Sequence, residues 1–296
     1  MSLADLLSID VSKLAPKAEA VKKVRASRSV DFPESAYVED DAAPIYHMSL
    51  IQGTSAWTAA RLGIPTASQF HRIVTGKGNP SRSAEGYLFE LLAERITGLP
   101  TVNFKSSWME RGHELESEAV NYYEFQKDVE TVPVGFITNA ARTIGASPDR
   151  LVGPDGLLEI KCPKPSTHVG YLLRIGDTYE DHGTQVQGQL SVSKRGWSDL
   201  LSYSPGMPPA LIRVERDEPF IRAMRGYIES FSAGLDAHTQ AAIERGWLKP
   251  DWQAFANAAN GGAGSLTSQK GFPPLLTRMN SIKSSRPSNW KTLCGG

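Results

Sequence analysis

Apolar residues recur along the chain with two periods, which distinguish helices from strands. Helical spacing is strongest over 84–97, a segment that ends at Gly98, and over 108–126. Shorter helical segments are expected over 55–61, 67–74, 167–174, 183–192 and 219–245, the last interrupted near Gly234. Strands are expected over 132–138, 143–152, 157–162, 197–203 and 210–216. This mixture of helices and strands predicts an α/β domain.

The segment 143–162 is expected to form a hairpin, because Gly153-Pro154-Asp155-Gly156 is a turn signal between its two strands. In the second strand, apolar residues at 158, 160 and 162 alternate with Glu159 and Lys161, so the charged side chains share one face. Asp149 lies on the first strand, where it can approach Glu159. The hairpin therefore gathers two carboxylates and one ammonium group.

This combination is suited to hydrolytic chemistry. Carboxylates supply the oxygen ligands of a hard divalent cation, and a lysine beside them can orient or deprotonate a water molecule. The common explanation of a Glu-x-Lys spacing is a solvated face with a weak ion pair. The neighbouring residues Leu157 and Leu158 favour a strand that is buried in a sheet instead.

Two residues earlier in the chain are suited to binding an anion. Ser68 follows the break at Ile64-Pro65-Thr66 and lies at the start of the helix predicted over 67–74, where backbone N–H groups attract negative charge. Arg61 supplies a planar, bidentate donor for phosphate. From the spacing alone, a plain helix cap and a surface arginine explain these residues equally well.

The order of several short motifs is more specific than any one of them. Ser147-Pro148-Asp149, nine further residues and then Glu159-Ile160-Lys161-Cys162-Pro163 resemble the core of PD-(D/E)XK nucleases. Within that superfamily the chain is most similar to the lambda-exonuclease branch, the YqaJ-type viral recombinases. The supporting blocks stand in the order of that family: Trp57-x-x-x-Arg61 with Thr66-Ala67-Ser68, Arg111-Gly112-x-x-x-Glu116, the hairpin, and Gln185-Val186-Gln187.

The resemblance implies a restriction-endonuclease-like core, a central mixed β-sheet flanked by helices. It also implies roles for individual residues. Mg²⁺, or Mn²⁺ as a substitute, would be held by Asp149, Glu159, the backbone carbonyl of Ile160 and Glu116. Lys161, aided by Gln185, would act on the attacking water. The 5′ phosphate of DNA would be bound by Arg61, Ser68, Ser147 and Gln185.

The activity implied by the resemblance is a Mg²⁺-dependent exonuclease that digests linear double-stranded DNA from 5′ to 3′. Such an enzyme leaves 3′ single-stranded overhangs for phage-type homologous recombination by strand annealing. The expected partners are duplex DNA with a 5′-phosphate end and a single-strand annealing protein, and the family commonly forms a ring-shaped trimer.

Two other functions use the same residues. A PD-(D/E)XK endonuclease of restriction or repair type would share the catalytic residues but would not need Arg61 to hold a 5′ phosphate. A non-catalytic DNA-binding scaffold would have lost its active site, and the presence of Asp149, Glu159 and Lys161 disfavours it.

Composition changes this picture little. Lysine plus arginine and aspartate plus glutamate number 32 each, so DNA binding has to come from local clusters of charge. The two cysteines, Cys162 and Cys294, form neither a disulfide framework nor a zinc site. The sequence shows no run of about 18 apolar residues and no secretory signal. We therefore expect a cytoplasmic protein, and the resemblance implies a bacterial host cell and a gene of phage or prophage origin.

Domain boundaries follow from changes in composition. Blocks of basic and then acidic residues predict a flexible N-terminal extension over 1–45. The exonuclease domain is expected over 46–247. A Gly/Ser-rich, basic C-terminal tail is expected over 248–296.

Overall fold

The structure is a computed structural model, and it describes residues 42–101, 107–249 and 252, with side chains of the helix that begins at 107 described from Glu114 onward. The extension expected over 1–45 and the tail expected over 248–296 lie almost entirely outside these residues. Within them, no helix is long and apolar enough to cross a membrane.

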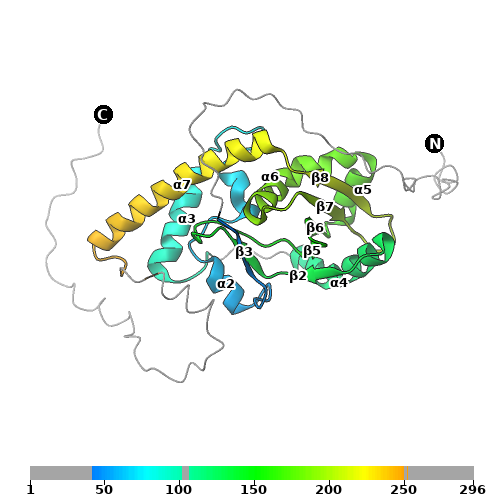
Figure 1. Cartoon of the computed structure of the whole chain (residues 1–296), viewed down its shortest axis with the longest axis horizontal. Helices are drawn as coiled ribbons and strands as arrows, with labels where there is room; N and C mark the ends of the chain where they lie inside the picture. The colour runs from blue at the N-terminus through cyan, green and yellow to red at the C-terminus, as the bar shows by residue number, and fades with distance from the viewer. Residues whose placement is uncertain (1–41, 102–106, 250–251, 253–296) are drawn as a thin grey trace, which may run out of the picture. The chain divides into compact units, whose positions relative to one another are not determined.

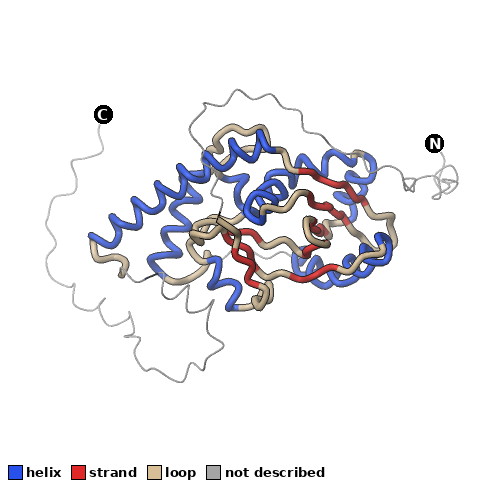
Figure 2. The backbone as a smooth tube through the Cα atoms, in the orientation of Figure 1, coloured by secondary structure: helices blue, strands red, loops and turns tan. Residues whose placement is uncertain are grey.

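The strands form two sheets, which lie side by side in Figures 1 and 2. The smaller sheet is antiparallel and has the order β1 (Ile45–His47), β3 (Phe136–Thr138), β4 (Gly145–Ala146). The larger has the order β2 (Thr131–Pro133), β5 (Arg150–Val152), β6 (Gly156–Lys161), β7 (Trp197–Ser202), β8 (Ala210–Glu215). Only β6 and β7 run parallel, so the larger sheet is mixed.

The helices flank this mixed sheet, as predicted. They are α2 (Ser55–Arg61), the 3₁₀ helix η2 (Ala67–Arg72), α3 (Ala84–Thr97), α4 (Ser107–Lys127), α5 (Pro165–Leu173), α6 (Ile175–Ser193) and α7 (Glu218–Glu244). The helix expected over 67–74 is thus shorter and of the tighter 3₁₀ type. The break expected near Gly234 is wrong, because α7 continues through it with one face buried.

The strands expected over 132–138 and 143–152 are each divided between the two sheets. The first passes from one sheet to the other at Val134 and Gly135, and the second passes back at 147–149. At Gly135 a Cβ atom would lie 2.1 Å from the backbone oxygen of Leu50, so only glycine fits beside that segment. Pro148 cannot donate to a ladder at the second passage. A period-two pattern of apolar residues does not reveal such a division, because the residues on both sides of the passage continue to alternate between apolar and polar.

Strand β6 is covered on both faces. Leu157 belongs to the larger apolar core, which α6 and α7 also form, whereas Leu158 and Ile160 pack with Ala119 and Val120 of α4. The alternation predicted for this strand is therefore confirmed. Burial on both faces explains why a charged residue on β6 needs partners from the protein.

The central helix α6 packs closely on η2. A Cβ atom at Gly188 would lie 2.6 Å from the ring of Phe70 and 3.1 Å from the Cβ of Ala67. Both of these residues are buried. The absence of a side chain at Gly188 thus allows η2 to lie directly on α6.

We predict that Gly188→Ala destabilises the protein by about 1–3 kcal/mol, because the added methyl group overpacks the α6–η2 contact. Gly170→Ala is the matched control: Gly170 is also helical, but its added Cβ meets nothing within 4 Å. There the substitution should be neutral or stabilising by up to about 1 kcal/mol. Urea denaturation of both variants measures the difference, and equal stabilities would contradict the packing argument.

Candidate active site

The backbone register places two carboxylates next to each other. Arg150 of β5 pairs with Leu158 of β6, so the preceding residue, Asp149, lies beside Glu159. Asp149 Oδ2 accepts a hydrogen bond of 2.6 Å from the backbone N–H of Ile160. The predicted approach of Asp149 to Glu159 is therefore present in the structure.

The carboxyl group of Asp149 is enclosed by protein atoms although the residue keeps some exposed surface. Burial raises its pKa well above the ordinary value of 3.8, and the negative charge of Glu159 raises it further. Glu116 acts in the same direction more weakly. The ionised form of Asp149 is thus held in an unfavourable place, as expected of a group that serves a function rather than stability.

Glu159 is only 3% exposed, and nitrogen donors surround its side chain. Lys161 Nζ and Gln185 Nε2 each donate to Oε1 at 2.6 Å, and Gln189 Nε2 donates to Oε2 at 2.6 Å. Lys161 Nζ also donates to Gln185 Oε1 at 3.1 Å. The two glutamines stand one turn apart on α6, so this helix and β6 together hold the carboxylate.

Lys161 remains an ammonium group in this environment. Burial alone would lower its pKa, but the charges of Glu159 and Asp149 and the hydrogen bond to Glu159 outweigh burial and raise the pKa above 10.5. In this arrangement Lys161 is a donor at neutral pH. That favours an orienting role over a deprotonating one among the two roles that the sequence left open.

The chemistry of these donors fits a hard divalent cation. Asp149, Glu159 and Glu116 offer only oxygen, and the charges of Glu159 and Glu116 both act on Asp149. The described residues nevertheless contain no group of three histidine, cysteine, aspartate or glutamate side chains close enough to hold an ion as they stand. Ile160 meets Asp149 through its N–H, and the metal role predicted for its carbonyl stays a prediction.

A second cluster surrounds Arg61, and its charge is positive. The guanidinium lies over the ring of Trp57, 4.0 Å from the ring centroid. It donates to Ser147 Oγ and to Thr66 Oγ1, both at the long distance of 3.4 Å. Burial lowers the pKa of Arg61 to about 10, a value at which it is still charged at neutral pH. Arg61 is thus a half-buried cation that donates to neutral hydroxyls.

Ser68 completes the positive cluster through Thr66, whose hydroxyl lies 3.4 Å from the hydroxyl of Ser68. Ser68 is the second residue of η2. Three residues predicted to bind phosphate, Arg61, Ser68 and Ser147, are thus gathered by α2, η2 and the passage that follows β4. Only Pro148 separates Ser147 from Asp149, so the positive cluster and the acidic pair adjoin.

Sequence reasoning assigned no role to three residues of these clusters. Gln189 and Thr66 are both buried, and each contacts a predicted site residue. The spacing of Gln189 from Gln185 on one helical face was the available signal. Trp57 entered the sequence analysis only as part of a motif, and its stacking on Arg61 depends on the three-dimensional arrangement.

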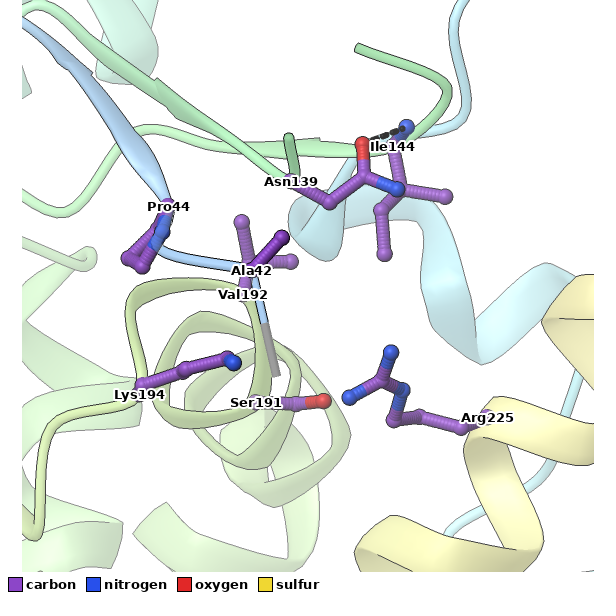
Figure 3. A pocket seen from close by; sticks show the side chains of 8 residues that line it. All are labelled: Ala42, Pro44, Asn139, Ile144, Ser191, Val192, Lys194 and Arg225. Carbon is purple, nitrogen blue, oxygen red and sulfur yellow. Dashed lines mark hydrogen bonds between the residues drawn. The ribbon is translucent and has the colours of Figure 1, made fainter. Parts of the chain in front are cut away.

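A pocket elsewhere in the described structure shares no residue with either cluster. It is formed where the C-terminal end of α6 meets α7 and the residues around β1 and β4 (Figure 3). Its lining residues are Ala42, Pro44, Asn139, Ile144, Ser191, Val192, Lys194 and Arg225. The candidate active site therefore rests on the two charged clusters and not on this pocket.

Comparison with known proteins places the chain in a family. The family model of the YqaJ-like viral recombinase domain matches residues 56–196, a range that contains both clusters. An alkaline exonuclease from Laribacter hongkongensis, LHK-Exo, is 33% identical, with a TM-score of 0.59, over 65% of this chain and 98% of that chain. Its complex with dAMP gives a TM-score of 0.60 at the same identity and coverage. A sequence comparison with the curated proteins finds no match.

The fold and the relatives define a nuclease of the restriction-endonuclease-like class. Within that class, the chain belongs to the YqaJ-like viral recombinase family, which includes exonucleases of the lambda type.

The raised pKa of Asp149 has a measurable consequence. A carboxyl group whose pKa is higher in the folded state than in the unfolded chain destabilises the fold as pH rises above the unfolded value, here 3.8. In chelator-treated buffer, Asp149→Asn should therefore increase the free energy of unfolding relative to wild type. The gain should grow with pH and level off once the pH exceeds the folded-state pKa of Asp149, because a tenfold change in a proton-binding constant corresponds to about 1.4 kcal/mol.

The control is Glu229→Gln, a change at an exposed glutamate within α7, which should alter stability by no more than about 0.5 kcal/mol at any pH. Denaturation from pH 4 to pH 8 measures both variants. An Asp149→Asn protein that is less stable than wild type at pH 8 would contradict the inferred burial of charge.

Proposed function

We propose that the chain is a metal-dependent exonuclease that digests linear double-stranded DNA from a 5′-phosphate end, in the 5′-to-3′ direction. The observation that carries the proposal is the adjacency of the two clusters. Ser147, which contacts Arg61, and Asp149, which lies beside Glu159, are only two residues apart in the chain. A phosphate bound at Arg61 would be the terminal one, and the next linkages would lie toward the carboxylates. The relative LHK-Exo forms a complex with dAMP, a nucleoside monophosphate, which is consistent with such a site.

The residues of the site would have different roles, which follow from their chemistry. Asp149 and Glu159, with Glu116, would hold Mg²⁺ or Mn²⁺, which supplies Lewis-acid stabilisation of the charge that develops on the scissile phosphate. The Lys161 ammonium group donates to Glu159 and Gln185, and in the reaction it would orient the attacking water together with Gln185. Gln189 holds the second oxygen of Glu159, which restricts how the carboxylate can turn.

The role of the positive cluster is to select DNA ends. Arg61 has two neutral partners at long distance, so it can donate bidentately to a phosphate without breaking an ion pair with either partner. Folding already removes part of the Arg61 guanidinium from water, so binding an anion there adds little further desolvation. An anionic ligand is therefore favoured over water. An internal phosphodiester carries one negative charge, whereas a terminal phosphate carries up to two and matches the site better.

The function is tested with end-labelled linear duplex, with and without a 5′ phosphate, incubated beside closed circular DNA. In Mg²⁺ the wild-type protein should release nucleotides from the 5′-phosphorylated strand and leave the circle intact. Excess chelator should stop the reaction, and added Mn²⁺ should restore it. Cleavage of the circle would support the endonuclease alternative, and unchanged digestion in chelator would contradict metal dependence.

Two variants separate end selection from chemistry. Arg61→Ala should slow digestion of 5′-phosphorylated ends roughly 10- to 150-fold, as expected for loss of about 1.5–3 kcal/mol of charged hydrogen bonding, and should bring both end types to similar rates. Lys161→Ala should slow both end types by about two to four orders of magnitude and leave their ratio unchanged.

The matched controls are Arg222→Ala and Lys164→Ala, which remove exposed cations that lie outside both clusters. Their rates should stay within about twofold of wild type if the charge effects are local. An Arg61→Ala enzyme that keeps its preference for phosphorylated ends would remove the basis for end selection.

A further inference from the structure

The two passages between the sheets lie side by side and adjoin the candidate site. The first, at Val134 and Gly135, joins β2 to β3, and the second, at 147–149, joins β4 to β5. None of these residues belongs to a strand ladder. Their backbone carbonyls therefore need partners from elsewhere, because buried carbonyls are almost always paired.

Gln52 supplies such a partner to both passages at once. Its Nε2 donates to the backbone oxygen of Val134 at 3.0 Å and to the backbone oxygen of Pro148 at 2.9 Å. An amide nitrogen has two hydrogens, so both are used. Pro148 has no N–H, and its carbonyl is therefore the only backbone hydrogen-bonding group at the middle of the second passage.

Trp57 makes a second bridge between the same two passages. Its Nε1 lies 2.8 Å from the backbone oxygen of Gly135 and 3.1 Å from Ser147 Oγ. The ring of Trp57 also supports the Arg61 guanidinium. The segment that carries Gln52 and Trp57 lies directly on the first passage, since Leu50 occupies the space that a side chain at Gly135 would need.

We propose that Gln52 is a positioning residue that fixes the position of the positive cluster relative to the acidic pair. It holds the carbonyl of Pro148, and the residues on either side of that proline belong to the two clusters: Ser147 to the first and Asp149 to the second. Among the described residues, the side chain of Gln52 donates to these two backbone carbonyls, so it acts through these neighbours. This inference rests on the proposed function, and it adds the device that ties end selection to cleavage.

The test is Gln52→Glu, which keeps the shape of the side chain and replaces its donor nitrogen with an oxygen that faces two carbonyl oxygens. At pH 8 the rate on 5′-phosphorylated linear duplex should fall roughly 10- to 100-fold, as is typical when a residue that orients a site residue is lost. The preference for phosphorylated over unphosphorylated ends should fall toward one. Gln52→Lys, which restores donors, should recover part of both quantities.

The ratio of the two rates distinguishes positioning from stability. A smaller folded fraction lowers both rates in proportion and leaves the ratio unchanged, whereas a displaced Ser147 changes the ratio. Gln240→Glu is the matched control, because it makes the same chemical change at an exposed residue of α7 and should leave both rates unaffected. If Gln52→Glu does not fold, Gln52→Ala carries the same expectation.

Two results would overturn the inference, and only the second of them would also reject the proposed function. A wild-type enzyme that prefers phosphorylated ends, together with Gln52 variants of unchanged ratio, rejects the positioning role and leaves the proposed function standing. A wild-type enzyme without any end preference rejects both.

Discussion

The confinement of two carboxylates in one buried place is the constraint on which the rest of the structure depends. The pairing of β5 with β6 puts Asp149 beside Glu159, and burial makes that proximity costly. Hydrogen bonds to Glu159 offset this cost, and they come from Lys161 of β6 and from the two glutamines of α6. Helix α6 therefore has to lie against β6, and its position sets the space that remains for η2.

The same helix links the two charged clusters. One turn of α6 presents Gln185 and Gln189 to Glu159, while Gly188, between them, admits η2, which carries Ser68. Positions 185, 188 and 189 lie on one side of the helix, so the negative and positive sites are built on neighbouring parts of a single helix segment. A side chain at position 188 would meet Phe70 and Ala67 of η2, and this arrangement explains why two glutamines and a glycine stand so close together in the sequence.

The sequence was sufficient for features that depend on local spacing. The helix at 84–97, the alternation of β6 and the approach of Asp149 to Glu159 all follow from periodicity or from a short hairpin. The division of two strands between sheets could not be predicted, because it depends on where Leu50 and Gln52 contact a distant part of the chain. The same is true of Gln189, whose identity suggests a surface residue until the sheet beneath it is known.

The balance of charge over the whole chain gives these local clusters their importance. With 32 basic and 32 acidic residues, the protein has no general attraction for DNA. Under the proposed function, affinity has to come from a few cations, and Arg61 is partly protected from screening by salt because it is half-buried and stacked on Trp57. Contacts along a duplex surface weaken steeply with salt. A half-buried guanidinium that bound one terminal phosphate would be less exposed to this effect, so under the proposed function selection of ends would persist under conditions in which binding along the duplex does not.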